Sequence, residues 1–293
     1  MAKFDVAKTV TANIIQMIED GISGDTWQAP WNNVADFPVN AKSKKAYRGT
    51  NVLQLWGAKY RRGYTSNYWA TFAQWKELGY TLKDAKGHAA MILAYQPYEK
   101  TVTDQNGKDT VEQRVYMKYF NVFNADLVEG WVEPETVTAE RLSGRMAGID
   151  AIIDGTGAEI AYGGNKAFYM PSMDRVQLPE FENFTSVEGF YSTMFHELGH
   201  WTGSKSRLDR DLSGRFGSES YAFEELVAEL TAAFTCSALG IVTETRQDHA
   251  KYVASWLKIL ENDTRAIMTA ASMASKAMEY IIAGETAEQS KAA

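Results

Sequence analysis

The sequence has few of the features that stabilise secreted or membrane proteins. Its 293 residues include a single cysteine, Cys236, so no internal disulfide can form. It has no run of 18 apolar residues, and its first residues lack the apolar core of a signal peptide. We therefore expect no membrane span, no membrane partner and a cytoplasmic location, where thiols stay reduced.

Acidic residues are missing from one part of the chain, although the whole chain carries a net charge of −7. Residues 1–130 hold 16 basic and 13 acidic side chains, whereas residues 131–293 hold 14 basic and 24 acidic ones. The negative total alone argues against a nucleic-acid partner. The asymmetry instead predicts that the two parts of the chain face different partners.

The order of predicted elements indicates an α+β protein of about two domains. Helical spacing predicts helices over residues 5–20, 51–61, 71–78, 141–154, 186–201, 221–239 and 247–283. Residues rich in β-branched and aromatic side chains predict strands over 91–98 and 113–123, joined through an Asn-Gly turn, and short strands over 159–162 and 167–170. We expect a domain with an antiparallel sheet and helices over residues 1–130, a polar linker over 131–140 and a second domain over 141–293.

Residues 37–76 contain no Asp or Glu, but they contain eight Lys or Arg residues and nine aromatic residues. Phosphates favour positive potential without competing carboxylates, and the bases of a single strand stack on aromatic rings. Three of the aromatic residues, Trp56, Phe72 and Trp75, have helical spacing and are expected to be buried. The window predicts binding of single-stranded nucleic acid, with candidate contacts from Lys42, Lys44, Lys45, Tyr47, Arg48, Asn51, Lys59, Arg61, Arg62, Tyr68, Trp69 and Gln74. The alternative is an ordinary solvated basic face.

The segment His196-Glu197-Leu198-Gly199-His200 is a candidate metal site on a helix that a capping box at Thr185-Ser-Val-Glu188 would begin. Residues i and i+4 lie on one helix face, so both imidazoles can reach one Zn²⁺ or another divalent ion such as Mn²⁺. Glu197 is placed to act as a general base on water.

A third ligand is expected on the next predicted helix, where Glu225 and Glu229 share a face at i and i+4. In zincin metallopeptidases with a glutamate third ligand, the first such acid binds metal and the second orients a histidine. Glu225 is thus the expected ligand and Glu229 the orienting residue, with Glu224 as the competing ligand. A solvated acidic helix face is the other alternative.

Two further features bear on the predicted second domain. The segment from Tyr169 to Val176 resembles the edge strand with which zincins pair an extended peptide. His249 and Tyr252, three residues apart on a later predicted helix, are candidates for stabilising an oxyanion, although they could equally be a surface pair.

The motifs together resemble the ArdC antirestriction proteins of conjugative plasmids. The N-terminal resemblance rests on Trp27-Gln-Ala-Pro-Trp31, Pro38-Val-Asn40, Tyr47-Arg-Gly-Thr-Asn51, Trp69-Ala-Thr-Phe-Ala-Gln74 and Val122-Phe-Asn124. The C-terminal resemblance rests on Phe195-His-Glu-Leu-Gly-His-Trp-Thr-Gly203, Arg207-Leu-Asp-Arg210 and Glu224-Glu-Leu-Val-Ala-Glu229. One departure is Leu82-Lys-Asp-Ala-Lys-Gly-His88, where the family often has a Val-x-Lys-Gly-Glu-like turn.

The resemblance implies an N-terminal domain that binds single-stranded DNA and a C-terminal zincin-like metallopeptidase domain. It also implies a bacterial cytoplasmic protein that protects incoming plasmid DNA from host restriction during conjugation, and that is transferred to or acts in the recipient cell. One hypothesis is a zinc peptidase whose substrate is a host restriction factor. The alternative is a non-enzymatic protein that coats single-stranded DNA or mimics DNA, in which the metal is structural.

Overall fold

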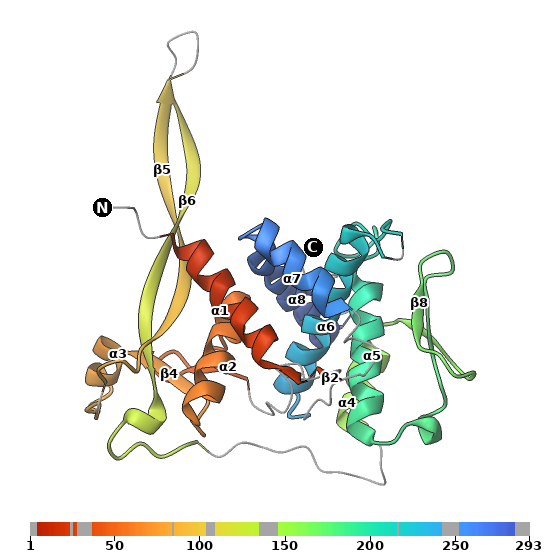
Figure 1. Cartoon of the computed structure of the whole chain (residues 1–293), viewed down its shortest axis with the longest axis horizontal. Helices are drawn as coiled ribbons and strands as arrows, with labels where there is room; N and C mark the ends of the chain where they lie inside the picture. The colour runs from red at the N-terminus through yellow and green to blue at the C-terminus, as the bar shows by residue number, and fades with distance from the viewer. Residues whose placement is uncertain are drawn as a thin grey trace. The chain divides into compact units, whose positions relative to one another are not determined.

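The computed structural model describes residues 5–23, 26–27, 37–83, 85–103, 109–134, 146–215, 217–241 and 252–284. The chain forms two compact units (Figure 1), the first comprising residues 1–37, 47–57 and 133–293 and the second residues 38–46 and 58–132. The first predicted helix therefore belongs to the same compact unit as the C-terminal part of the chain. The sequence-based domain boundaries at 130 and 141 stay a prediction. None of the described helices is long and apolar enough to cross a membrane.

The first unit is built mainly from helices. They are α1 (Val6–Asp20), α4 (Ala147–Gly155), α5 (Val187–Thr202), α6 (Glu219–Ala238), α7 (Val253–Asn262) and α8 (Ala266–Ala283), together with the first residues of α2 (Thr50–Arg62). The core contains Phe190, Phe195 and Leu198 from α5, and Ile281 from α8 packs with them. Most residues of α5 and α6 are buried, and they include polar residues such as His196 and Glu225.

The single helix predicted over residues 247–283 is wrong, because α7 and α8 are separate helices. Asp263 has an extended conformation, with φ −131° and ψ 104°, and its side chain accepts a 2.8 Å hydrogen bond from the backbone N–H of Arg265. Asp competes in this way with helical backbone bonding, which explains the break. The start of the predicted helix lies outside the described residues.

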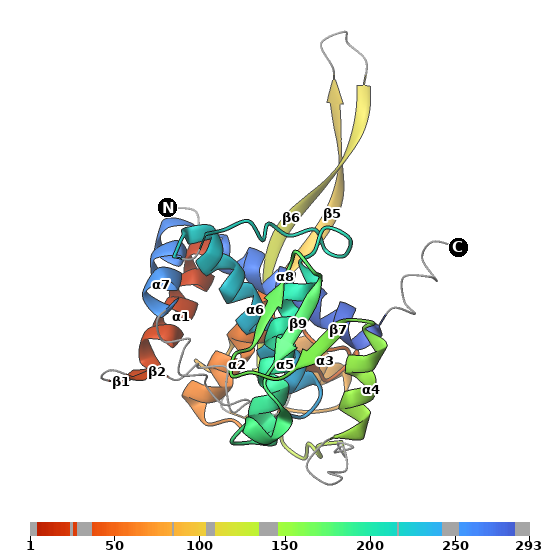
Figure 2. The ribbon, with the colours of Figure 1, turned by 90° about the vertical axis from the view of Figure 1, so that its right-hand side faces the viewer.

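A three-stranded sheet packs against α5 in the first unit (Figure 2). Its order is β7 (Glu159–Tyr162), β9 (Arg175–Leu178) and β8 (Phe168–Met170), with β8 antiparallel to β9 at one edge. The expectation of one edge strand from Tyr169 to Val176 is therefore wrong: a turn that includes Asp174, at φ 50°, separates two strands. A two-residue pair, β1 (Ile22–Ser23) with β2 (Thr26–Trp27), also belongs to this unit.

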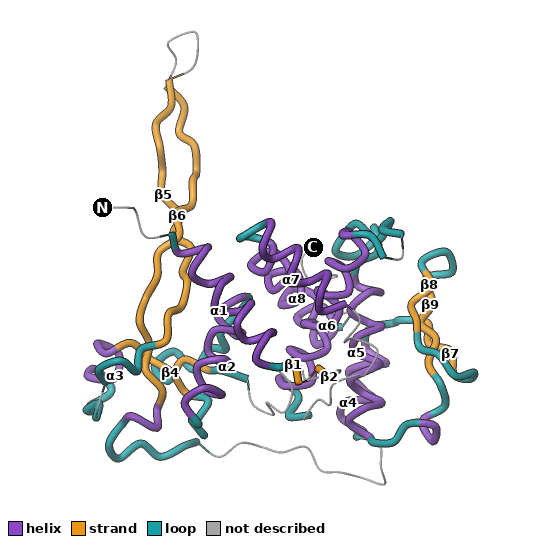
Figure 3. The backbone as a smooth tube through the Cα atoms, viewed as in Figure 1, coloured by secondary structure: helices purple, strands orange, loops and turns teal. Residues whose placement is uncertain are grey.

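The second unit contains a four-stranded sheet in the order β3 (Val39–Asn40), β4 (Tyr68–Thr71), β6 (Asp109–Asn124) and β5 (Ala90–Thr103). The predicted antiparallel hairpin is confirmed, and β5 and β6 run side by side along their full length (Figure 3). Within this sheet, as far as the described residues show, the short β3 pairs in parallel with β4 and the other pairs are antiparallel.

The helix α3 (Phe72–Glu77) follows β4 directly and begins with a capping box between Thr71 and Gln74. Trp75 is fully buried as expected, and its indole N–H donates to the carbonyl oxygen of Phe123 at 3.1 Å. Trp56, in the first unit, is also buried. The prediction for Phe72 is wrong, because its side chain is 59% exposed: of the residues of α3, only Trp75 is buried.

Candidate metal centre and nucleic-acid surface

Two buried helices carry the candidate metal ligands. Ser186 caps helix α5, one residue later than the expected cap, and its hydroxyl accepts a hydrogen bond from the N–H of Gly189 at 3.0 Å. Gly199 lies where α5 meets α6, and a Cβ atom there would lie 3.2 Å from Cα of Ala228 and 3.2 Å from Cβ of Thr231. The absence of a side chain at Gly199 therefore lets α6 approach α5 closely, next to the histidines.

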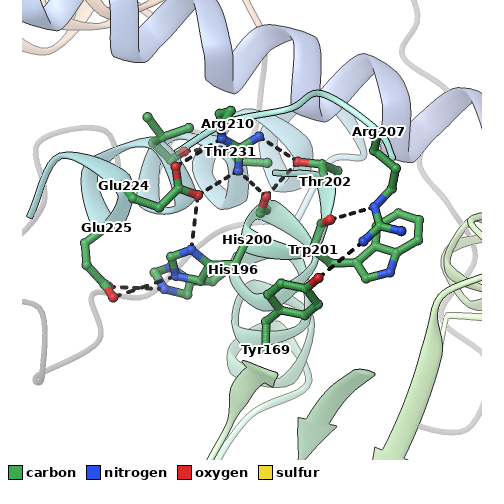
Figure 4. Close-up of polar contacts among 12 residues, drawn as sticks. Tyr169, His196, His200, Trp201, Thr202, Arg207, Arg210, Glu224, Glu225 and Thr231 are labelled. Atoms are coloured by element: carbon green, nitrogen blue, oxygen red, sulfur yellow. Dashed lines mark hydrogen bonds and ion pairs between the residues drawn. The ribbon is translucent and has the colours of Figure 1, made fainter. Parts of the chain in front are cut away.

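The structure brings His196, His200 and Glu225 together, with one potential ligand atom of each within 4.8 Å of the others. Glu225 Oε2 lies 3.5 Å from His196 Nε2, and Glu225 Oε1 lies 3.8 Å from His200 Nε2 (Figure 4). Burial would raise the pKa of Glu225, but the hydrogen bond and charge of His196, with the charge of His200, lower it to about 2. Two imidazoles and one carboxylate are a donor set that Zn²⁺ accepts, so these residues fit a divalent ion.

The opposite nitrogens of the two histidines face other carboxylates. His196 Nδ1 lies 3.8 Å from Glu229 Oε2, and His200 Nδ1 lies 3.3 Å from Glu224 Oε1. Glu229 thus lies where an orienting residue is expected. Glu224 lies on the Nδ1 side of His200, away from the Nε2 atoms that face Glu225. Carboxylates in such positions fix the tautomer and direction of a ligating imidazole.

Arg210, which the sequence analysis quoted only within a motif, is the buried cation that holds Glu224. Its Nη2 lies 2.7 Å from Glu224 Oε1 and its Nε 3.1 Å from Oε2, and it also donates to Thr202 Oγ1 and to the carbonyl oxygen of Gly199. Burial raises the pKa of Glu224, but His200 and Arg210 outweigh burial and hold this pKa below its ordinary value. The network ties the loop after α5 to both ligand-bearing helices.

A cleft of about 700 Å³ opens beside the histidines. Glu197, only 4% exposed, lines it, as do residues of the edge strand β8 and its flanks. Tyr252 also lines the cleft, and its hydroxyl oxygen lies 3.4 Å from that of Tyr221, a residue that the sequence analysis missed. Burial, followed by hydrogen bonds with Tyr252 and Glu225, raises the pKa of Tyr221. His249 lies outside the described residues.

The end of β8 is tied to the loop that follows α5. Arg207 Nη1 donates to Asp174 Oδ2 at 3.0 Å, its guanidinium lies 3.9 Å from the ring centroid of Trp201, and the Tyr169 hydroxyl donates to Asp174 Oδ1 at 2.8 Å. Burial and then Asp174 raise the pKa of Tyr169 to about 12. These contacts hold the edge strand beside the cleft.

The candidate DNA contacts are divided between the two units. Tyr47, Arg48 and Asn51 belong to the first unit, and the other nine belong to the second. Two rings offer no free face: Trp69 is 1% and Tyr47 9% exposed. The expected contacts of these two rings with bases stay a prediction, which their burial disfavours.

Several candidate cations already have partners. Lys42 pairs with Glu77, Lys44 lies over the rings of Tyr68 and Trp131, and Arg48 pairs with Glu279. Arg62 donates to the backbone carbonyls of residues 87, 88 and 89, which indicates a structural role. Lys42, Lys44, Lys45, Arg48 and Arg61 are nevertheless exposed, whereas Asn51, Lys59, Arg62, Tyr68 and Gln74 are half-buried.

The fold and the site define a zincin-like protein. Residues 147–273 match the family of zincin-like metallopeptidases, and residues 4–123 match the N-terminal domain of anti-restriction factor ArdC. The metal-free and Mn(II)-bound crystal structures of the antirestriction ArdC protein from plasmid R388 are 34% identical to this chain, with TM-scores of 0.78 and 0.76. Each match covers 95% of this chain and 97% of the R388 chain.

Two other relatives are similar in sequence. The uncharacterized protein y4eC of Sinorhizobium fredii is 38% identical over 97% of this chain and 94% of its own length. A DNA primase TraC of Escherichia coli is 34% identical over 94% of this chain, which corresponds to only 27% of the primase. The chain belongs to the ArdC-type antirestriction proteins. The expected resemblance and the α+β fold with a zincin-like C-terminal domain are confirmed.

Proposed function

We propose that this protein binds one divalent ion on His196, His200 and Glu225 and hydrolyses peptide bonds. The observation that carries the proposal is the two-sided arrangement of the histidines, whose Nε2 atoms face Glu225 while their Nδ1 atoms face Glu224 and Glu229. The donor set suits Zn²⁺, and Mn(II) is present in one R388 ArdC structure. When bound, such an ion polarises a carbonyl group and lowers the pKa of water.

The chain's own residues supply the rest of the chemistry. Glu197 follows His196 directly and lines the cleft, so its carboxylate can accept a proton from water. The hydroxyl groups of Tyr221 and Tyr252 can donate hydrogen bonds to a carbonyl oxygen as it gains charge. The edge strand β8 can pair with an extended peptide, which would lie along the cleft.

The test is the substitution Glu197→Gln, which removes the base and keeps the size of the side chain. We expect cleavage of a peptide library, followed by mass spectrometry, to fall by about 10²-fold or more, while metal binding is retained. The matched control is Glu188→Gln, in the half-buried first turn of the same helix and outside the lining of the cleft, which should leave cleavage unchanged. Unchanged cleavage in Glu197→Gln would overturn the proposed mechanism.

In the antirestriction pathway, we propose that this activity acts on a host restriction factor while plasmid DNA enters a recipient cell. A conjugation assay into a restricting host tests the link. If the Glu197→Gln protein protects the DNA as well as the wild type does, proteolysis has no part in protection. The non-enzymatic alternative, with a structural metal and DNA coating or mimicry, would then hold.

We further propose that the second unit binds single-stranded DNA. Support comes from its exposed cations within the acid-free window. Affinity for an oligonucleotide should fall steeply with salt, and the double substitution Lys44→Ala with Lys45→Ala should flatten that dependence by about two charges. Lys276→Ala, an exposed cation in the acidic C-terminal part, should leave the slope unchanged. Equal affinity for duplex and single strand would contradict the expected stacking.

A further inference from the structure

A second groove, of about 680 Å³, lies in the second unit where α3 begins. Its lining comes from β3, from the start of α3 and from the hairpin, and it shares no residue with the cleft beside the histidines. The lining residues used below are Asn40, Thr71, Phe72, Gln74, Phe120 and Asn121. The volume falls within the range of about 300–1,000 Å³ that is typical of small-molecule pockets.

Aromatic side chains supply the apolar part of this groove. Phe72 is 59% exposed although it carries no polar group, and Phe120 is half-buried. Lys118 Nζ lies 5.0 Å from the centroid of the Phe120 ring, which places a positive charge next to an aromatic lining residue. Rings beside a cation are the combination that holds a base and its phosphate in single-stranded nucleic acid.

Amide groups supply the polar part. Gln74 Oε1 accepts hydrogen bonds from the N–H of Thr71 at 2.9 Å and from Asn40 Nδ2 at 3.2 Å, so the orientation of the Gln74 amide is fixed. Among the described residues, neither Gln74 Nε2 nor the side chain of Asn121 makes a hydrogen bond. The groove therefore offers an oriented donor and a second amide that can both donate and accept.

We propose that this groove binds one unstacked base of single-stranded DNA. The base would stack against Phe72 or Phe120, its edge would face Gln74 and Asn121, and Lys118 would contact the adjacent phosphate. A nucleobase matches the lining because its faces are apolar and its edge carries donors and acceptors. The proposal rests on the proposed binding of single-stranded DNA and assigns one base position within it.

The first experiment measures oligonucleotide affinity by fluorescence anisotropy for the wild type, Phe72→Ala and Tyr60→Ala. Tyr60 is the matched control because its ring is 74% exposed in the same unit but does not line the groove. We expect Phe72→Ala to weaken binding about 5- to 150-fold with an unchanged salt slope, since the substitution removes stacking but no charge. Tyr60→Ala should bind as the wild type does. Equal affinities for Phe72→Ala and the wild type would overturn the proposal.

The second experiment uses an oligonucleotide of the same length without bases. We expect the wild type to lose affinity for it, while Phe72→Ala loses less, because the variant has no ring contact left to lose. The substitution Asn121→Ala should reduce differences in affinity among homopolymers of the four bases. Equal losses in the wild type and in Phe72→Ala would show that the ring contacts something else, such as a peptide side chain.

The two proposals fail in different ways. If the wild type binds no single-stranded DNA at low salt, the proposed function of the second unit fails. The wild type could instead bind with the expected salt dependence but lose as much affinity for the abasic oligonucleotide as Phe72→Ala does. In that case only the proposed base position fails. Circular dichroism of Phe72→Ala distinguishes lost contact from lost folding, and the exposed ring predicts an unchanged spectrum.

Discussion

Replacing Arg210 with methionine should destabilise the protein strongly, because the change leaves a buried carboxylate without its cation. The side chains of Arg210 and Glu224 are only 4% and 10% exposed, and two short contacts join them. Methionine fills similar space but cannot donate to Glu224, to Thr202 or to the carbonyl oxygen of Gly199. Breaking one side of such a buried pair typically costs about 3–5 kcal/mol.

Urea unfolding followed by circular dichroism measures this loss in the metal-free protein. The control Arg114→Met removes a guanidinium whose ion pair with Glu112 is exposed, so the unfolding midpoint should not move. Adding Glu224→Gln to Arg210→Met should recover more than half of the loss, because a neutral amide needs no cation. A loss below about 1 kcal/mol in Arg210→Met would refute the reasoning.

The Arg210→Met variant should also depend on pH in a defined direction. Without the guanidinium, only His200 still opposes burial, so the pKa of Glu224 should rise above its value in the folded wild type. Protonation then relieves the penalty, so the loss relative to the wild type should be smaller at about pH 5 than at about pH 8. A loss that grows as the pH falls would contradict this assignment of the buried charge.

Three further predictions follow from the site. Gly199→Ala should lower the free energy of unfolding, measured in urea, by about 1–3 kcal/mol and weaken metal binding, because the new methyl group would push α6 away from α5. The control Gly148→Ala, whose Cβ would meet nothing within 4 Å, should leave the free energy of unfolding unchanged. Saturating the wild type with Zn²⁺ at about 100 times its Kd should stabilise it by about 2.7 kcal/mol, and a chelator should reverse the shift in Tm. Arg207→Leu should raise the pKa of Asp174 toward its ordinary value, because hydrogen bonds from Arg207 lower that pKa in the folded chain. Carboxyl NMR measures this pKa, and an unchanged value would refute the role of Arg207.

Features encoded within one short stretch were predictable from the sequence. The helix that carries His196 and His200 follows from a capping pattern and an apolar face, and the hairpin of β5 and β6 follows from β-branched and aromatic residues on both sides of an Asn-Gly turn. The exposure of Phe72 was not predictable from helical spacing. Phe72 and Trp75 are three residues apart on α3, yet only Trp75 is buried, and which of the two is buried depends on how the short helix packs against the sheet.

The choice between Glu224 and Glu225 depends on contacts distant in sequence. Neighbours on a helix point about 100° apart, and either could face the histidines until the approach of α6 to α5 is known. Gly199 sets that approach, and Arg210 captures Glu224 from the intervening loop. The grouping of α1 with the C-terminal helices is likewise a tertiary contact that local periodicity does not encode.

The central claim is that Glu225, and not Glu224, completes the metal site with His196 and His200. Calorimetric titration of the metal-free protein with Zn²⁺ tests it directly. We predict one ion per chain for the wild type and a loss of about 10–100-fold in affinity for Glu224→Gln, which removes the carboxylate that faces His200 Nδ1 and pairs with Arg210 but removes no metal ligand. We predict a clearly larger loss for Glu225→Gln. A Glu225→Gln protein that binds Zn²⁺ as tightly as the wild type, or a larger loss for Glu224→Gln, would contradict the account.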